Sequence, residues 1–184
     1  MKSPVYERES EVQLYVREYE NERYGMGDRR KKDVHRILSG IRKKGSLLDV
    51  STGRGETLDM AHRLGFTSVY GTEVVKSLTG GRVKFAYAHE LPFADNDFDY
   101  VTCFDVLEHL VEDDIRPALA EMWRVARVAV IVSASERPSV FGGRDLHISK
   151  RPAADWLKMF REVWGNAERI GMAGGSPAFK GVKP

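Results

Sequence analysis

The stretch from Leu47 to Glu56, which reads Leu-Leu-Asp-Val-Ser-Thr-Gly-Arg-Gly-Glu, constrains the fold more than any other part of the sequence. An apolar run leads into an acid, Asp49, and is followed by two glycines one residue apart, Gly53 and Gly55. Glycine adopts positive φ and lets a ligand approach the backbone closely. The unpaired N–H groups of a following helix then face that ligand. The stretch therefore predicts a buried strand that turns sharply into a helix at a nucleotide-type site.

Two common nucleotide-binding motifs do not fit this turn. A phosphate-binding P-loop requires Gly-x-x-x-x-Gly-Lys-Ser/Thr, and no such string occurs in the sequence. The dinucleotide fingerprint Gly-x-Gly-x-x-Gly fails because its third glycine falls on Leu58. A nicotinamide-dependent dehydrogenase is therefore disfavoured.

After Gly45, segments with strand-like and helix-like patterns alternate along the chain. We expect strands at residues 47–51, 68–73, 83–88, 98–104, 128–133 and 168–172, and residues 178–183 could supply a seventh. Helices are expected at 56–64, near Pro117 at a first turn, and at 152–164. This alternation predicts an α/β fold, a Rossmann-like, doubly wound, mostly parallel sheet of six to seven strands.

The length of 184 residues predicts one domain, residues 1–184. Within it, residues 1–45 are expected to form a helical extension and residues 46–184 the Rossmann-like core. The extension shows apolar stripes at helical spacing over residues 10–22 and again after Asp28. The basic run at 29–32 is interpreted as a solvated helix face rather than a nucleic-acid site.

Composition excludes several classes of protein. The formal net charge of +2 is too small to indicate nucleic acid or a membrane surface as a partner. Cys103 is the single cysteine, so no intrachain disulfide can form, and its apolar surroundings predict a buried thiol. We find neither a signal-peptide pattern nor an apolar stretch long enough to span a membrane. The expected location is the cytoplasm.

Three ordered motifs resemble those of the class I S-adenosylmethionine-dependent methyltransferases. Asp49, Gly53 and Gly55 match motif I, with Ser51 where the first glycine is usual. Residues 88–101 resemble the family pattern Ala-x-x-Leu-Pro-Phe-x-Asp-x-x-Phe-Asp-x-Val. Residues 104–110, Phe-Asp-Val-Leu-Glu-His-Leu, resemble the family motif that follows the fourth strand. The resemblance runs from about Gly45 to Ser133 and implies S-adenosylmethionine as the cofactor.

The cofactor-binding residues divide among the parts of that molecule. Glu73, at the end of a predicted strand about twenty residues after the glycine turn, is placed to accept hydrogen bonds from the ribose hydroxyls, next to Val74. The resemblance implies that Ala88 and His89 bind the adenine edge, where Tyr87 stands in place of the usual aspartate. It also implies that Phe104 and Asp105 face the methionine half. The expected set is Asp49, Ser51, Gly53, Gly55, Glu73, Val74, Ala88, His89, Phe104 and Asp105.

An oxygen acceptor usually needs a base, and histidine suits neutral pH. His147 lies two residues after Asp145 in a long loop after the fifth predicted strand, and both are candidate catalytic residues. The competing interpretation, that they only anchor this loop, is equally weighted.

Asp105, Glu108 and His109 share the spacing of one helix face, and His147 could be a fourth metal ligand. This set resembles the acid-x-x-Glu-His pattern of metal-assisted methyltransferases, such as ubiquinone-biosynthesis O-methyltransferases and small-RNA 2′-O-methyltransferases. Similar strings occur in methyltransferases without a metal. The sequence prediction is therefore a metal-independent enzyme, with the metal-assisted O-methyltransferase as an alternative.

The expected function is methyl transfer to a small-molecule or exposed-group acceptor, with no role for nucleic acid or membrane. The extension, with Tyr15, Tyr19 and Tyr24, is expected to fold over the methionine end of the cofactor and to help enclose the acceptor. A second alternative is a non-catalytic S-adenosylmethionine-binding module. The acceptor atom and the oligomeric state do not follow from the sequence.

Overall fold

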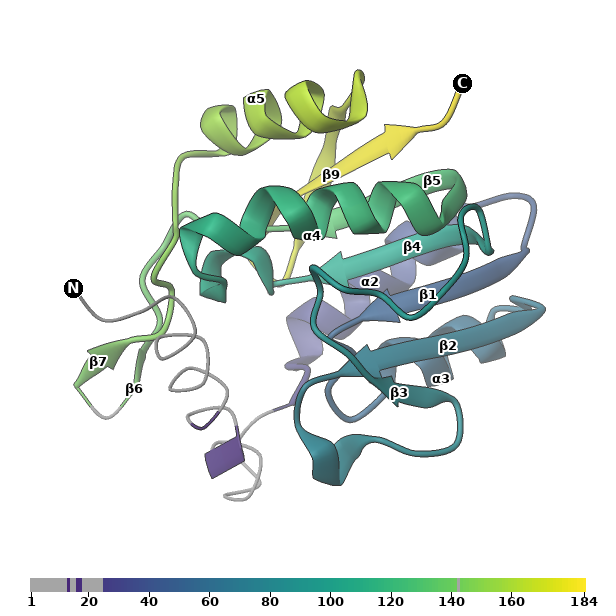
Figure 1. Cartoon of the computed structure of the whole chain (residues 1–184), viewed down its shortest axis with the longest axis horizontal. Helices are drawn as coiled ribbons and strands as arrows, with labels where there is room; N and C mark the ends of the chain where they lie inside the picture. Colours follow the sequence, from purple (N-terminus) through teal and green to yellow (C-terminus); the bar gives the residue numbers. More distant parts are fainter. Residues whose placement is uncertain (1–12, 14–15, 18–24, 142) are drawn as a thin grey trace.

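The structure, a computed structural model, describes residues 13, 16–17, 25–141 and 143–184 (Figure 1). Its main feature is a seven-stranded sheet in the order β3-β2-β1-β4-β5-β9-β8. The strands are β1 (Ser46–Val50), β2 (Ser68–Glu73), β3 (Val83–Phe85), β4 (Phe98–Phe104), β5 (Ala126–Ser133), β8 (Glu168–Ala173) and β9 (Ser176–Val182). All are parallel except β9, which runs antiparallel to both of its neighbours. The predicted Rossmann-like sheet is confirmed, and residues 176–182 supply its seventh strand.

Helices cover both faces of this sheet, as Figure 1 shows. One face carries α2 (Asp28–Ser39) and α3 (Glu56–Arg63), and the other carries α4 (Glu112–Val125) and α5 (Ala153–Trp164). Side chains alternate between the faces along each strand, so the adjacent residues Leu47 and Leu48 enter different apolar cores. Both are fully buried. Burial on both faces of the sheet explains why two apolar residues stand side by side in β1.

Two local expectations were wrong. Pro117 does not stand in the first turn of its helix, because α4 begins five residues earlier at Glu112. The acids at positions 112–114 fill that first turn, where negative charge is favourable. The long loop expected after the fifth predicted strand contains a small hairpin, β6 (Val140–Phe141) and β7 (Arg144–Asp145).

The described part of the N-terminal region is mainly α2. It begins after Gly27 and buries Val34 and Leu38 in the core beneath β8 and α3. The other predicted helix, at residues 10–22, lies largely outside the described residues, as do Tyr15, Tyr19 and Tyr24. Among the helices that the structure describes, we find none with the length and apolar character needed to cross a membrane.

Candidate functional site

The turn between β1 and α3 is built from three residues in the left-handed backbone region. Ser51, Gly53 and Gly55 have φ values of 56°, 58° and 78°, and Gly55 precedes the first residue of α3. Non-glycine residues adopt this region at a cost of about 1 kcal/mol. Ser51 stands where the motif usually has glycine, and it keeps the positive φ that glycine adopts more easily. The backbone of the turn is therefore left-handed at this position despite the serine.

Glu73 joins this turn to the end of β2. Its Oε2 accepts a hydrogen bond from the backbone N–H of Gly53 at 2.8 Å, and its Oε1 accepts from Val74 at 2.8 Å and Val75 at 3.1 Å. Burial raises the pKa of this carboxyl, while the three N–H donors oppose that shift. The side chain thus fixes two strand ends relative to each other.

Asp49 lies one strand away, on β1. The Thr102 hydroxyl on β4 donates a hydrogen bond to its Oδ1 at 2.6 Å. Burial raises the pKa of Asp49 to about 6, although hydrogen bonds from neighbouring threonines act in the opposite direction and lower it. This carboxyl is therefore a buried group whose ionised form is costly in the absence of a cationic partner.

A cavity opens over the carboxyl ends of β1, β2 and β4, the usual ligand side of such a sheet. Nine of the ten expected cofactor-binding residues line it: Asp49, Ser51, Gly53, Glu73, Val74, Ala88, His89, Phe104 and Asp105. Gly55, the tenth, instead shapes the turn below the cavity. The structure thus brings these residues together from distant parts of the chain.

One end of the cavity carries Tyr87 and His89, which follow β3. Their rings stack with centroids 5.4 Å apart. The His89 Nδ1 lies 3.5 Å from the carboxylate of Asp114, a buried acid in the first turn of α4 that also lines the cavity. Flat rings beside a carboxylate form a suitable environment for a nitrogenous heterocycle.

The other end of the cavity carries Asp105 and Arg30. Asp105 has φ of 53° and accepts a hydrogen bond from the Ser133 hydroxyl at 2.7 Å. It also forms an ion pair with Arg30, which reaches across from α2. Gly25 and Met26 line the same end, so the described N-terminal residues help to enclose it.

Sequence reasoning missed Arg30 and Asp114 as cavity residues. Arg30 belongs to the basic run that was interpreted as a solvated face, and only the packing of α2 shows that one of its charges enters the cavity. Asp114 was overlooked because α4 was expected to begin later. Three acids in a row before an apolar helix face were the available signal for that first turn.

His147 and Asp145 are not among the described residues that line the cavity. Asp145 accepts hydrogen bonds from the backbone N–H groups of Ser139 and His147, at 2.9 and 3.0 Å, and pairs with Lys150. The Lys150 hydrogen bond is the largest cause that lowers the pKa of Asp145 to about 2. Asp145 therefore holds the β6–β7 hairpin and does not touch the His147 imidazole through any contact that the structure records.

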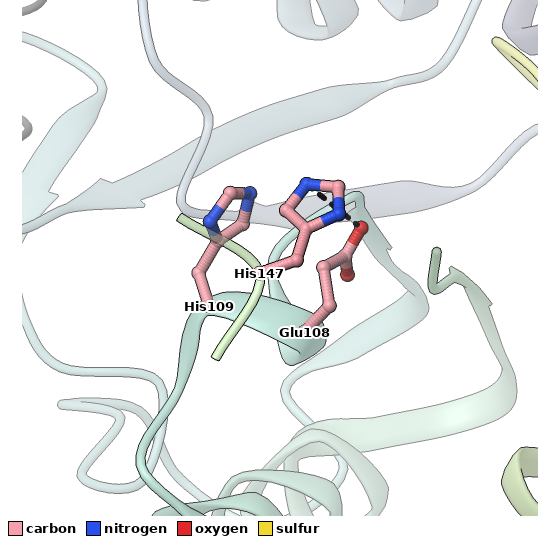
Figure 2. Close-up of side chains that lie close together, drawn as sticks. All are labelled: Glu108, His109 and His147. Carbon is pink, nitrogen blue, oxygen red and sulfur yellow. Dashed lines mark ion pairs between the residues drawn. The ribbon is translucent and has the colours of Figure 1, made fainter. Parts of the chain in front are cut away.

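His147 instead joins Glu108 and His109, which lie in a short 3-10 helix, η2 (Leu107–His109) (Figure 2). Their potential ligand atoms all lie within 4.8 Å of one another. Burial raises the pKa of Glu108 to about 8 and lowers that of His109 to about 3. Asp105 does not share a helix face with this pair, contrary to the expected spacing, because it precedes η2 with a left-handed backbone.

Comparison with known proteins agrees with this arrangement. Residues 48–132 match the methyltransferase domain family. The crystal structure of a 1,6-didemethyltoxoflavin-N1-methyltransferase from Burkholderia thailandensis superimposes on the whole chain and on 91% of that enzyme, with a TM-score of 0.71 and 18% identity. The chain has the class I S-adenosylmethionine-dependent methyltransferase fold.

Within this methyltransferase fold, sequence similarity is more limited. A demethylmenaquinone methyltransferase from Roseiflexus sp. is 34% identical over 103 residues, which are 50% of this chain and 42% of that enzyme. The chain thus spans less than half the length of that curated relative. The [4+2]-cyclase SpnF also shares the fold, with a TM-score of 0.60, 20% identity, and coverage of 77% of this chain and 61% of SpnF. The fold alone therefore does not define the reaction.

Proposed function

We propose that this protein binds S-adenosylmethionine in the cavity and transfers its methyl group to a small-molecule or exposed-group acceptor. The observation that carries the proposal is the convergence of three carboxylates, from Asp49, Glu73 and Asp105, at the ends of three adjacent strands. Such a cavity favours a ligand that combines cationic groups with hydroxyl donors. S-adenosylmethionine has a sulfonium, an ammonium and a ribose diol.

The residues divide among the parts of the cofactor as follows. Glu73 accepts hydrogen bonds from the ribose hydroxyls, beside Val74. Ala88 and His89 bind the adenine edge through the backbone. Asp105 binds the methionine ammonium. All of these residues line the cavity, and they follow β2, β3 and β4 at the same edge of the sheet, which supports the assignments.

When bound, S-adenosylmethionine supplies a methyl group that is already activated by the sulfonium. The protein has to orient the acceptor and exclude water. Leu110, Val111 and Met26 line the cavity, and their apolar side chains suit an organic acceptor. The Burkholderia enzyme, whose structure contains 1,6-didemethyltoxoflavin, is a neighbour with a small-molecule ligand and supports this class of acceptor.

The metal-independent reaction expected from the sequence assigns removal of the acceptor proton to His147, with Asp145 positioning its loop. His147 does not line the cavity in the described part of the chain, so this role stays a prediction. The Arg137 carbonyl accepts a hydrogen bond from the His147 Nδ1–H at 2.5 Å, which leaves the lone pair of the imidazole on Nε2.

Calorimetry with S-adenosylhomocysteine tests the binding part of the proposal. Gly53→Val places a branched side chain in the turn at φ of 58° and should weaken binding by more than tenfold, about 1.4 kcal/mol. Gly40→Val, at a helix end outside the cavity with φ of −66°, is the control and should bind normally. A folded wild-type protein that does not bind S-adenosylhomocysteine would refute the assignment.

A screen of small-molecule acceptors tests the reaction. We expect conversion of S-adenosylmethionine to S-adenosylhomocysteine together with a product heavier by one methyl group. An acceptor that is converted while the cofactor keeps its methyl group would indicate chemistry of another kind.

A further inference from the structure

The cluster of Glu108, His109 and His147 has features that the cofactor cavity does not explain. Glu108 is fully buried, and its Oε2 has no hydrogen-bond partner among the described residues. A buried carboxylate oxygen without a hydrogen bond is unfavourable. Its other oxygen accepts the Ser135 backbone N–H at 2.9 Å. One oxygen is thus held in place while the other lacks a partner.

Backbone carbonyls fix the tautomer of both histidines. The Nδ1 of His109 lies 2.9 Å from the Leu146 carbonyl oxygen, and the Nδ1 of His147 lies 2.5 Å from that of Arg137. A carbonyl oxygen only accepts hydrogen bonds, so each Nδ1 must carry the proton. Each neutral imidazole then has its lone pair on Nε2, and the carbonyl partner fixes the direction of the ring.

This arrangement is the usual environment of metal-ligating histidines, which donate their second ring N–H to a carbonyl or a carboxylate. The three side chains converge in Figure 2, and the Nε2 of His147 lies 4.0 Å from the Oε1 of Glu108. Ligands of a tetrahedral ion with bonds of about 2.1 Å lie about 3.4 Å apart. The recorded separations, up to 4.8 Å, therefore require only a small inward movement of the three side chains.

We propose that Glu108, His109 and His147 bind one divalent transition-metal ion beside the cofactor cavity. Two nitrogens and one carboxylate oxygen suit Zn²⁺ and its first-row neighbours, whereas Mg²⁺ and Ca²⁺ prefer oxygen ligands alone. Asp105 is not a ligand in this proposal, because it pairs with Arg30 and the Ser133 hydroxyl. The proposal replaces the metal-independent expectation with a three-residue site.

The site also suggests a class of acceptor, and this step rests on the proposed function. His109 lines the cofactor cavity, so an ion bound to it adjoins the space where the acceptor must lie. Three protein ligands leave coordination positions for water or for an oxygen of the acceptor. The ion lowers the pKa of a bound hydroxyl. The expected substrates are phenols, enols or alcohols, methylated on oxygen.

Metal binding is measured first, without any acceptor, on tag-free full-length protein stripped with a chelator. We expect calorimetry to give one Zn²⁺ per chain, Co²⁺ to produce visible absorption bands, and Mg²⁺ at the same concentration to give no binding. Loss of a residue that only supports a metal ligand typically weakens metal affinity by about 10–100-fold. Glu108 and His147 are direct ligands in this proposal. Glu108→Gln and His147→Gln should therefore each weaken Zn²⁺ binding by at least about 100-fold. His62→Gln, at an exposed histidine of α3, is the matched control and should bind normally.

Several outcomes would overturn the site. A folded wild-type chain that binds no Zn²⁺ at micromolar concentration would do so, as would equal affinity in wild type, Glu108→Gln and His147→Gln. Binding of Mg²⁺ in preference to Zn²⁺ would refute the ligand chemistry. Thermal melts of each variant identify loss of the fold, and any variant that fails to fold is replaced by His147→Asn.

Activity separates this inference from the proposed function. The metal-stripped protein should bind S-adenosylhomocysteine with unchanged affinity but lose O-methyl transfer, and Zn²⁺ should restore it. Failure to bind S-adenosylhomocysteine would refute the proposed function and leave the metal site standing. Methyl transfer that persists after complete removal of the metal would refute the role of the ion in acceptor activation.

Discussion

At the scale of single residues, Glu73 and Asp49 show how buried carboxylates prepare a site for a cation-bearing ligand. Glu73 has three backbone N–H donors, and Asp49 has the Thr102 hydroxyl. Both are almost fully buried, and burial raises the pKa of each. The chain thus keeps two carboxyl groups in a position that is more favourable when positive charge is nearby.

Glu73→Ala should weaken binding of S-adenosylmethionine and of S-adenosylhomocysteine equally, by about 1.5–3 kcal/mol, because the ribose is common to both. Calorimetry with the two ligands measures this. The control is Glu90→Ala, which removes an exposed acid from the loop after β3. A mutant that loses affinity for only one of the two ligands would assign Glu73 to another part of the cofactor.

Asp49 should make the ligand-free fold less stable as pH rises. Its ordinary pKa of 3.8 is raised to about 6 by burial, so the folded state retains a proton that the unfolded state has released. The free energy of unfolding should therefore fall by about 2–3 kcal/mol as pH rises from about 4 to 7. Asp49→Asn has no titrating carboxyl at this position, so its free energy of unfolding should not show this fall with pH. Urea denaturation at several pH values compares the two, and parallel curves would contradict the prediction.

At the scale of elements, Arg124 of α4 stabilises the loop that follows β3 through hydrogen bonds and ion pairs. Its guanidinium donates hydrogen bonds to the carbonyls of Phe93, at 2.8 Å, and Leu91, at 3.2 Å, and it pairs with Asp95 and Glu121. The Glu121 carboxylate in turn accepts the Leu91 N–H at 2.9 Å. Residues 87–89 at the start of this loop line the cavity. The C-terminal half of α4 therefore supports one wall of the site.

Arg124→Gln should loosen the loop without unfolding the sheet. We expect faster hydrogen exchange at residues 89–97 and a cofactor affinity lower by about tenfold, or 1.4 kcal/mol. Arg116→Gln in the same helix removes only an exposed ion pair with Glu162 and serves as the control. Unchanged exchange in the loop of Arg124→Gln would show that packing alone holds this wall.

Prediction from sequence succeeded where a local pattern determines the structure. β4 spans the expected residues because Phe98–Phe104 is rich in aromatic and β-branched residues and follows a polar turn. The glycine turn and the strand-end acids also lie where their spacing indicated. The grouping of His147 with Glu108 and His109 was anticipated only as an alternative, through a resemblance. The contact of His147 with the Arg137 carbonyl was not predicted, because the two residues belong to a loop without a periodic pattern. The helical periodicity of α2 predicts which of its faces is apolar. It does not predict that Arg30, one of several basic residues on this helix, lines a cavity.

At the scale of the whole molecule, β9 joins the edge strand β8 to the rest of the sheet. It pairs with β5 on one side and β8 on the other, and its Phe179 packs on Phe160 of α5. Gly181 lies directly under two tryptophans: a Cβ there would be 2.6 Å from a ring atom of Trp164 and 3.2 Å from one of Trp123. The close approach of strand and helix requires glycine at this position.

Gly181→Ala should therefore destabilise the entire fold, by about 1–3 kcal/mol, through overpacking. Chemical denaturation measures the loss. Gly40→Ala is the control, since its Cβ would come no closer than 3.4 Å to any neighbour, and it should be nearly neutral. Wild-type stability of Gly181→Ala would mean that α5 can shift away from β9 without penalty.

The place of β9 between two strands that precede it in sequence has a consequence for synthesis on the ribosome. β5 and β8 do not pair with each other, so β5 keeps an open hydrogen-bonding edge until β9 has emerged. Chains grow at about 5–20 residues per second, and an unpaired edge promotes association with other chains during that time. β8 and the open edge of β5 therefore lack a partner strand until Ser176–Val182 has been made. The nascent protein is expected to depend on chaperones most strongly just before its seventh strand is made.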